Sequence, residues 1–194
     1  MTVGPIAGDT TYEVVGGRDF EALIPALAEI LSDAVDSGAA VNFLRPFPVA
    51  DAEAWWRSRS PDVARGTIRP IVARLDGEIV GVVLLVPSPK QNSPYRADVQ
   101  KVLVHRRARG RGIGSGLMAT LEDVARAAGL WLLILDTYTG SDADRMYRRL
   151  GWRDFGTVPD YALDADGVPA PATFFYKDLR EATGGDAAGG GEAG

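Results

Sequence analysis

The feature that most constrains this chain is a glycine-rich loop between a strand pattern and a helix pattern, at residues 102–117. Before the loop, alternating residues up to Val104 are typical of a strand, and after it Ile113, Leu117 and Leu121 recur at helical spacing. Glycines let backbone N–H groups turn toward an anion, and the first turn of the following helix adds unpaired N–H groups and a positive dipole end. The segment therefore predicts an α/β domain with a phosphate-binding site.

Three phosphate-binding patterns compete for this loop. A P-loop requires Lys followed by Ser or Thr directly after its last glycine, and the chain has neither at that spacing. A dinucleotide-binding loop requires glycines at its first, third and sixth positions, but counting from Gly110 or Gly112 places another residue at the sixth. The pattern that fits is Arg-x-x-Gly-x-Gly, at Arg109, Gly112 and Gly114. It predicts a loop that holds a pyrophosphate.

Basic residues gather around the loop although the chain has a net charge of −5. Arg106, Arg107, Arg109 and Arg111 lie close together, and either a bound polyphosphate or simple solvation of a basic loop would account for them. The overall charge disfavours general nucleic-acid binding, and the aromatic residues do not alternate with the basic ones. The absence of cysteine excludes disulfides, thiolate metal sites and a cysteine nucleophile, and the lone His105 has no matching carboxylates for a zinc site. We therefore expect no metal.

The remaining patterns describe a mixed α/β domain. We expect strands at 12–15, 69–75, 79–86, 97–104, 130–135, 152–158 and 173–179, and helices at 46–60, 113–129 and 141–151. A further helix should begin near Pro25 and stop near Gly38. The Gly-containing link after residue 75 predicts a hairpin, and the apolar run at 130–135 is typical of a strand buried on both faces. This order predicts a mixed sheet with an antiparallel first half and a strand–helix–strand crossover in the second.

Three segments divide the chain. We expect residues 1–11 to be a flexible N-terminus, 12–180 to form the single domain, and 184–194, composed of Gly, Ala and acidic residues, to be a disordered tail. No apolar stretch approaches the ~20 residues of a membrane helix, and the first residues lack the basic-then-apolar pattern of a secretory signal. We therefore expect a cytoplasmic protein without membrane or nucleic-acid partners, as a monomer or a homodimer.

The loop and its flanks resemble the acyl-CoA-binding signature of the GNAT superfamily of N-acetyltransferases. The resemblance continues at 141–152, where Ala143 and Tyr147 precede a Leu-Gly-Trp ending. Residues 96–101, 135–137, 159–161 and 174–177 resemble the branch that contains the tabtoxin-resistance acetyltransferase. In all, the resemblance covers residues 12–179 and implies a GNAT-like acyl-CoA N-acyltransferase fold with acetyl-CoA as co-substrate.

The resemblance also implies roles for individual residues. Val102 and Val104 would offer backbone groups to the pantetheine arm. The pyrophosphate would be held by Arg109, Gly110, Arg111, Gly112, Ile113 and Gly114. Asp98 stands where the branch has a glutamate, Asp136 stands at its aspartate, and Tyr147 stands at the tyrosine that protonates the thiolate. Because aspartate is one methylene shorter than glutamate, direct proton transfer by Asp98 and a water relay both remain open.

The expected reaction is acetyl transfer from acetyl-CoA to a primary amine of a small-molecule acceptor, by direct attack in a ternary complex. The amine arrives as an ammonium and must lose a proton, and Asp98 and Asp136 near strand ends would attract it. Simpler alternatives are an exposed strand position for Asp98, a turn residue for Asp136 and a core aromatic for Tyr147. A catalytically silent acyl-CoA sensor on the same fold is the competing hypothesis. The adjacent tryptophans 55 and 56 could line the acceptor pocket or belong to the core.

Overall fold

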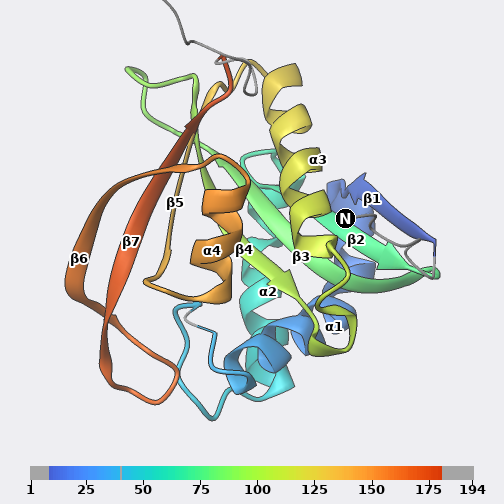
Figure 1. Cartoon of the computed structure of the whole chain (residues 1–194). Coiled ribbons are helices and arrows are strands. Elements are labelled where there is room, and N and C mark those ends of the chain that lie inside the picture. Colours follow the sequence, from blue (N-terminus) through green and yellow to red (C-terminus); the bar gives the residue numbers. More distant parts are fainter. Residues whose placement is uncertain (1–8, 40, 181–194) are drawn as a thin grey trace, which may run out of the picture.

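A seven-stranded sheet with the order β1-β2-β3-β4-β5-β7-β6 is the frame of the structure, a computed structural model that describes residues 9–39 and 41–180 (Figure 1). The strands are β1 (Thr10–Val14), β2 (Arg69–Leu75), β3 (Glu78–Pro87), β4 (Arg96–Val104), β5 (Leu132–Tyr138), β6 (Arg153–Leu163) and β7 (Pro169–Asp178). Neighbouring strands from β1 to β4 are antiparallel, β4 and β5 are parallel, and β5, β7 and β6 are antiparallel. The mixed sheet expected from the sequence is confirmed.

Two helices cover each face of the sheet (Figure 1). α1 (Gly17–Asp36) and α2 (Val49–Ala64) lie on one face, and α3 (Ile113–Ala127) and α4 (Asp142–Arg149) lie on the other. A short 3-10 turn, η1 (Arg106–Ala108), connects β4 to the loop before α3. α3 is the crossover between the parallel strands β4 and β5, as the sequence predicts.

Both helices of the first face continue through a proline. The expected start near Pro25 was wrong, because α1 begins at Gly17 and Pro25 lies inside it. A proline removes one N–H and frees one carbonyl, but Pro25 and, in α2, Pro61 lie on exposed sides where water can solvate that carbonyl. The buried faces, with Ile24 and Leu27 in α1, fix the helices by packing. Tertiary packing thus overrides the local signal.

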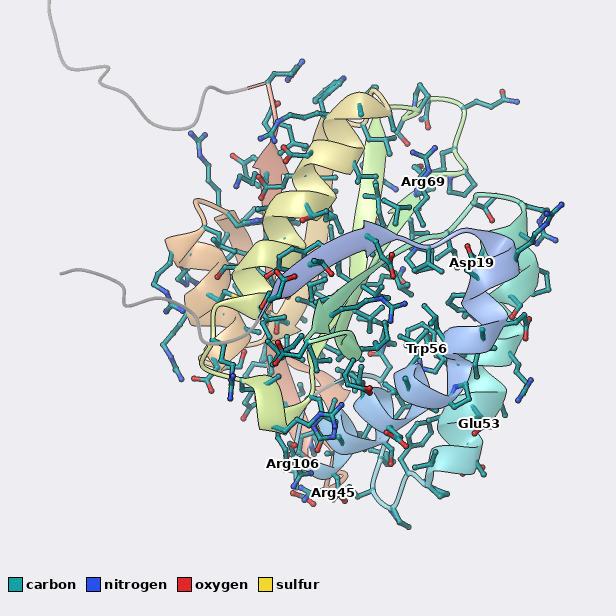
Figure 2. All side chains as sticks on the ribbon, turned by 90° about the vertical axis from the view of Figure 1, so that its right-hand side faces the viewer. Asp19, Arg45, Glu53, Trp56, Arg69 and Arg106 are labelled. Carbon is teal, nitrogen blue, oxygen red and sulfur yellow. The ribbon has the colours of Figure 1, made fainter. Side chains whose placement is uncertain are left out.

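The adjacent tryptophans of α2 have different environments. Trp56 is completely buried between α1 and α2, where its Nε1 donates to the Leu27 carbonyl at 2.9 Å (Figure 2). Trp55 is half-buried, and its ring packs against Phe43 with a centroid distance of 5.7 Å. Trp56 is therefore a core residue, and Trp55 is left as a candidate for the rim of a site.

A bulge in β4 breaks the alternation expected for residues 97–104. Lys101 has a φ of 52°, and the register against β3 shifts at the same place. One extra residue in a strand reverses which face the following side chains serve. Val99 and Val102 therefore both contact the core under α3, whereas strict alternation places them on opposite faces. Lys101 turns to the other face, where it meets Trp55 of α2.

Two further expectations, one on the N-terminal segment and one on the burial of β5, differ from the structure. Thr10 and Thr11, assigned above to a flexible N-terminus, pair with β2 and so belong to the sheet. In β5, Leu133 and Leu135 are buried but Ile134 is only half-buried, so this strand is not buried equally on both faces. The expected tail at 184–194, and residues 1–8 of the expected flexible N-terminus, lie outside the described residues.

Within residues 9–39 and 41–180, no helix is long and apolar enough to cross a bilayer. The division into one domain at 12–180 with flanking segments stays a prediction.

Candidate active site

The candidate site lies where β4 and β5 separate. In the described structure these strands pair only from Arg96 opposite Leu132 to Asp98 opposite Ile134, although both continue beyond that point. A cavity of about 750 Å³ opens between their diverging ends. Its walls come from the end of α1 and the residues that follow it, residues 99–104 of β4, the glycine loop, the end of β5 and α4. A strand edge with unpaired N–H and C=O groups can hold an extended ligand arm by backbone hydrogen bonds.

Most residues predicted from the sequence line this one cavity. They are Val102, Val104, Arg109, Gly110, Gly112, Ile113, Gly114, Asp136 and Tyr147. Asp98 and Arg111 are not among the lining residues. The fold therefore brings the loop, the end of β5 and α4 together, and it leaves Asp98 beside the cavity, half-buried where β4 still pairs with β5.

The loop has the backbone that an anion requires. Gly110 and Gly112 each have a φ of 76°, a left-handed conformation that favours glycine. A Cβ at either position would meet nothing within 4 Å, so the space above the backbone is open. Gly112 precedes the first residue of α3, and no side chain caps that helix. The first N–H groups of α3 are thus available to a bound phosphate.

The arginines around the loop do not act alike. The backbone N–H and the guanidinium of Arg106 both donate to the carboxylate of Asp33 on α1 (Figure 2). Arg109 donates through Nε to the Val104 carbonyl at 3.0 Å, and its guanidinium lies 3.7 Å from the same Asp33. Part of the basic cluster therefore docks the loop onto α1, a role that neither sequence alternative included. Asp33 gives no signal in the sequence, because it is one of several acidic residues on an ordinary amphipathic helix.

Asp136 stands at the cavity end of β5. Its side chain is exposed to solvent, but the surrounding protein removes part of its water, and this partial desolvation raises the pKa of the carboxyl. The nearby charge of Lys101 opposes that increase, and the carboxylate of Asp98 adds to it. Asp136 is thus a carboxylate with a raised pKa inside a cavity, the setting of a proton acceptor more than that of a turn residue.

Tyr147 reaches the cavity from the buried face of α4. It is only 4% exposed and packs against Trp152 and Phe175, each with ring centroids 5.9 Å away. Burial first, and then the charge of Asp136, raise the pKa of its phenol well above the usual value. The core alternative is correct for the ring, but the residue also lines the cavity. Its hydroxyl stays protonated throughout the physiological range and can serve as a hydrogen-bond donor.

Lys101 is a cavity residue that sequence reasoning missed as part of the site. Its Nζ donates to the Val41 carbonyl at 2.9 Å and lies over the rings of Phe43 and Trp55, at 5.2 and 5.1 Å from the centroids. Burial lowers the pKa of its ammonium to about 8, and the charge of Asp136 partly restores it. Alternation places Lys101 on the face of Val99, and the bulge at positive φ turns it to the other face, toward Val41 and Trp55.

Comparisons with known proteins agree with this geometry. Residues 32–152 match the acetyltransferase (GNAT) family. The IAA acetyltransferase of Azospirillum brasilense is 36% identical over 104 residues, which cover 53% of this chain and 65%, just under two thirds, of that relative. The L-methionine sulfoximine/L-methionine sulfone acetyltransferase of Pseudomonas aeruginosa is 28% identical over 138 residues, 70% of this chain and 78% of the relative.

Solved structures share the fold. The ribosomal-protein-alanine N-acetyltransferase of Brucella melitensis superimposes with a TM-score of 0.70 at 26% identity, over 87% of this chain and 99% of that one. A phosphinothricin acetyltransferase of Sinorhizobium meliloti, solved in complex with AcCoA, has a TM-score of 0.72 at 19% identity over 88% of each chain. At that lower identity the likeness concerns the fold alone.

Proposed function

The chain belongs to the acetyltransferase (GNAT) family, as its loop suggested, and we propose that it transfers the acetyl group of acetyl-CoA to a primary amine of a small-molecule acceptor. One observation carries the proposal: a single cavity joins the glycine loop at the start of α3 to Asp136 and Tyr147. The loop suits a pyrophosphate, and the other two side chains suit proton transfer. A silent binding module would need only the loop. The narrower resemblance to the tabtoxin-resistance branch stays a prediction.

The open edge of β4 and the loop would hold the co-substrate. Val102 and Val104 lie in the part of β4 that does not pair with β5, so their backbone groups can meet an extended pantetheine arm. The Val104 carbonyl already accepts from Arg109, which places this guanidinium beside the path of the arm. The pyrophosphate would lie over Gly112 at the N-terminus of α3, where backbone N–H groups and the helix dipole favour negative charge.

Direct attack of the amine on the thioester requires two proton movements. The ammonium must lose a proton before its nitrogen attacks the acetyl carbon, and the Asp136 carboxylate can attract it and take that proton. The departing thiolate must be stabilised and protonated, and the Tyr147 hydroxyl can donate to it. We assign Asp98 an indirect role, because it does not line the cavity and its charge raises the pKa of Asp136. The 194-residue chain has no cysteine, so no acetyl-cysteine intermediate can form.

A panel of amines tests the proposed function. Release of free CoA thiol would be measured with acetyl-CoA and L-methionine sulfone, L-methionine sulfoximine, other amino acids, polyamines and peptides, and products would be weighed by mass spectrometry. We expect turnover of at least one small amine, with a gain of one acetyl group on nitrogen. Tight binding of acetyl-CoA without transfer to any amine would instead indicate a silent binding module. Transfer to peptide N-termini alone would contradict the small-molecule acceptor.

Gly112→Val tests the position of the pyrophosphate. The valine side chain would enter the open space above the loop, where the phosphate should lie, so we expect acetyl-CoA affinity to fall by about 10–100-fold, the value of one or two charge-assisted hydrogen bonds. Strain at positive φ should also lower the melting temperature. Isothermal calorimetry measures the affinity.

Gly77→Val is the matched control for that strain. Gly77 lies in the β2–β3 turn with a φ of 87° and equally open surroundings, but far along the chain from the loop. It should lower the melting temperature while leaving acetyl-CoA affinity unchanged. If the Gly112→Val variant and the unmodified protein bind acetyl-CoA with equal affinity, the pyrophosphate does not bind at this loop.

A further inference from the structure

Lys101 is a half-buried cation without an ion-pair partner among the described residues. Its Nζ has one carbonyl partner and two aromatic ring faces, and among the described residues it has no ion-pair partner within 4.0 Å. Ring faces and a carbonyl stabilise a cation, but much less than a carboxylate does. Burying a lysine without a counterion is costly, and such residues are rare outside functional sites.

Lys177 in the same protein shows how a largely buried lysine with a structural role is held. Its Nζ donates to the Glu122 carboxylate at 2.7 Å and to the Leu150 carbonyl at 2.8 Å, so its charge is fully paired. Lys101 has the carbonyl but lacks the carboxylate. The missing partner is therefore an anion, and the side that can receive one is the cavity that Lys101 lines.

The charges around Lys101 indicate what kind of ligand would carry that anion. Asp136 acts on Lys101 electrostatically from β5 and lines the same cavity, while Arg59 of α2 adds positive charge from the other side. An amine drawn to Asp136 would thus lie next to a positive region around Lys101. A molecule that satisfies both carries an ammonium and, a few atoms away, a negative group.

We propose that Lys101 determines acceptor specificity by binding a carboxylate that the acceptor carries beside its reactive amine. This inference rests on the proposed function and names the acceptor class as amines with a neighbouring carboxylate, as in amino acids. The bulge in β4 is the device that creates the subsite, since it turns Lys101 out of the strand alternation toward the α1–α2 connection. A strained, non-glycine residue at positive φ is often retained where it serves a site.

Lys101→Met tests the proposal with matched pairs of acceptors. Methionine keeps most of the side-chain length and its packing between the two rings, and it removes the ammonium with its charge and its hydrogen bond to the Val41 carbonyl. For each amino acid that the enzyme acetylates, kcat/KM is measured for the acid and for its carboxamide. We expect the unmodified enzyme to prefer the acid, and the preference to fall by about 10–100-fold in Lys101→Met, mainly through KM. The comparison between enzymes cancels the difference in basicity between the two amines.

Lys90→Met is the control, because it makes the same change at an exposed loop position. It should leave the acid-to-amide preference as in the unmodified enzyme. Calorimetric binding of the same pairs, with CoA present, gives the ratio without turnover and so separates this inference from the proposed function. An unmodified enzyme with no preference for the acid would overturn the proposal. So would a Lys101→Met variant, folded by its melting temperature, that loses acid and amide equally.

Discussion

Asp136→Asn should lower kcat/KM for amine acetylation by about 10²–10⁴-fold, the range that a general base typically contributes. Asparagine keeps the size and one oxygen of the side chain but can neither attract the ammonium as a charge nor take its proton. The surrounding protein raises the pKa of Asp136, which narrows the gap to the much higher pKa of the ammonium and eases the transfer. Steady-state kinetics on any acceptor from the amine panel measures the effect.

The role of Asp136 as a base also predicts how kcat/KM changes with pH. The active form of Asp136 is the carboxylate, so kcat/KM should fall as the pH decreases through its pKa, which lies above the usual aspartate range. Asp136→Asn should lose this acidic limb. Lys101→Met should keep it but move it to higher pH, because the cation that lowers the pKa of Asp136 is gone. An unmoved limb in both variants would assign the titration to another group.

Stability separates a catalytic from a structural effect. A carboxyl whose pKa is raised by folding binds its proton more tightly in the folded than in the unfolded state, so it costs stability above its folded pKa. Asp136→Asn should therefore melt at the same or a higher temperature at neutral pH. The control is Asp142→Asn, which also lines the cavity but has a fully exposed side chain (100%), and should keep nearly full activity. Near-normal activity of Asp136→Asn would end the base assignment.

Local patterns identified the loop, and the resemblance to a family singled out Asp136 and Tyr147, which line the same cavity. Gly110 and Gly112 precede α3 and Gly114 lies in its first turn, so the proposed pyrophosphate site is encoded within one short segment. Asp136 and Tyr147 come from separate elements, and their meeting depends on the crossover through α3, which the order of strands and helices predicts. The resemblance to a family then assigned roles that periodicity alone left open.

Tertiary contacts decided what the sequence did not reveal. Alternation assumes an uninterrupted strand, so it put Lys101 on the wrong face and gave no reason to include it in the site. The arginines were treated as one cluster, although Arg106 is paired with Asp33 on a helix far away in the sequence. A bulge and a long-range ion pair both depend on neighbours that are absent from a local window.

Tyr147→Phe should lower kcat by about 10²–10³-fold while the KM for acetyl-CoA changes little. The substitution keeps the ring that packs against Phe175 and removes only the hydroxyl. Burial raises the pKa of this phenol, so it remains protonated at every usual assay pH and acts as a hydrogen-bond donor to the developing thiolate. An alkaline limb in the unmodified enzyme would then belong to another group, and Lys101, with a pKa of about 8, is the candidate.

Tyr138→Phe is the control for that substitution, because Tyr138 also lines the cavity but is 41% exposed and sits at the end of β5, outside the core around α4. It should leave kcat unchanged. A thiolate that Tyr147 no longer stabilises makes acetyl transfer slow whatever the acceptor, so the loss in Tyr147→Phe should be similar for amino acids and for their amides. This distinguishes it from the loss in Lys101→Met, which depends on the carboxylate. Full kcat in folded Tyr147→Phe, on an acceptor that the unmodified enzyme acetylates well, would show that Tyr147 serves only the core.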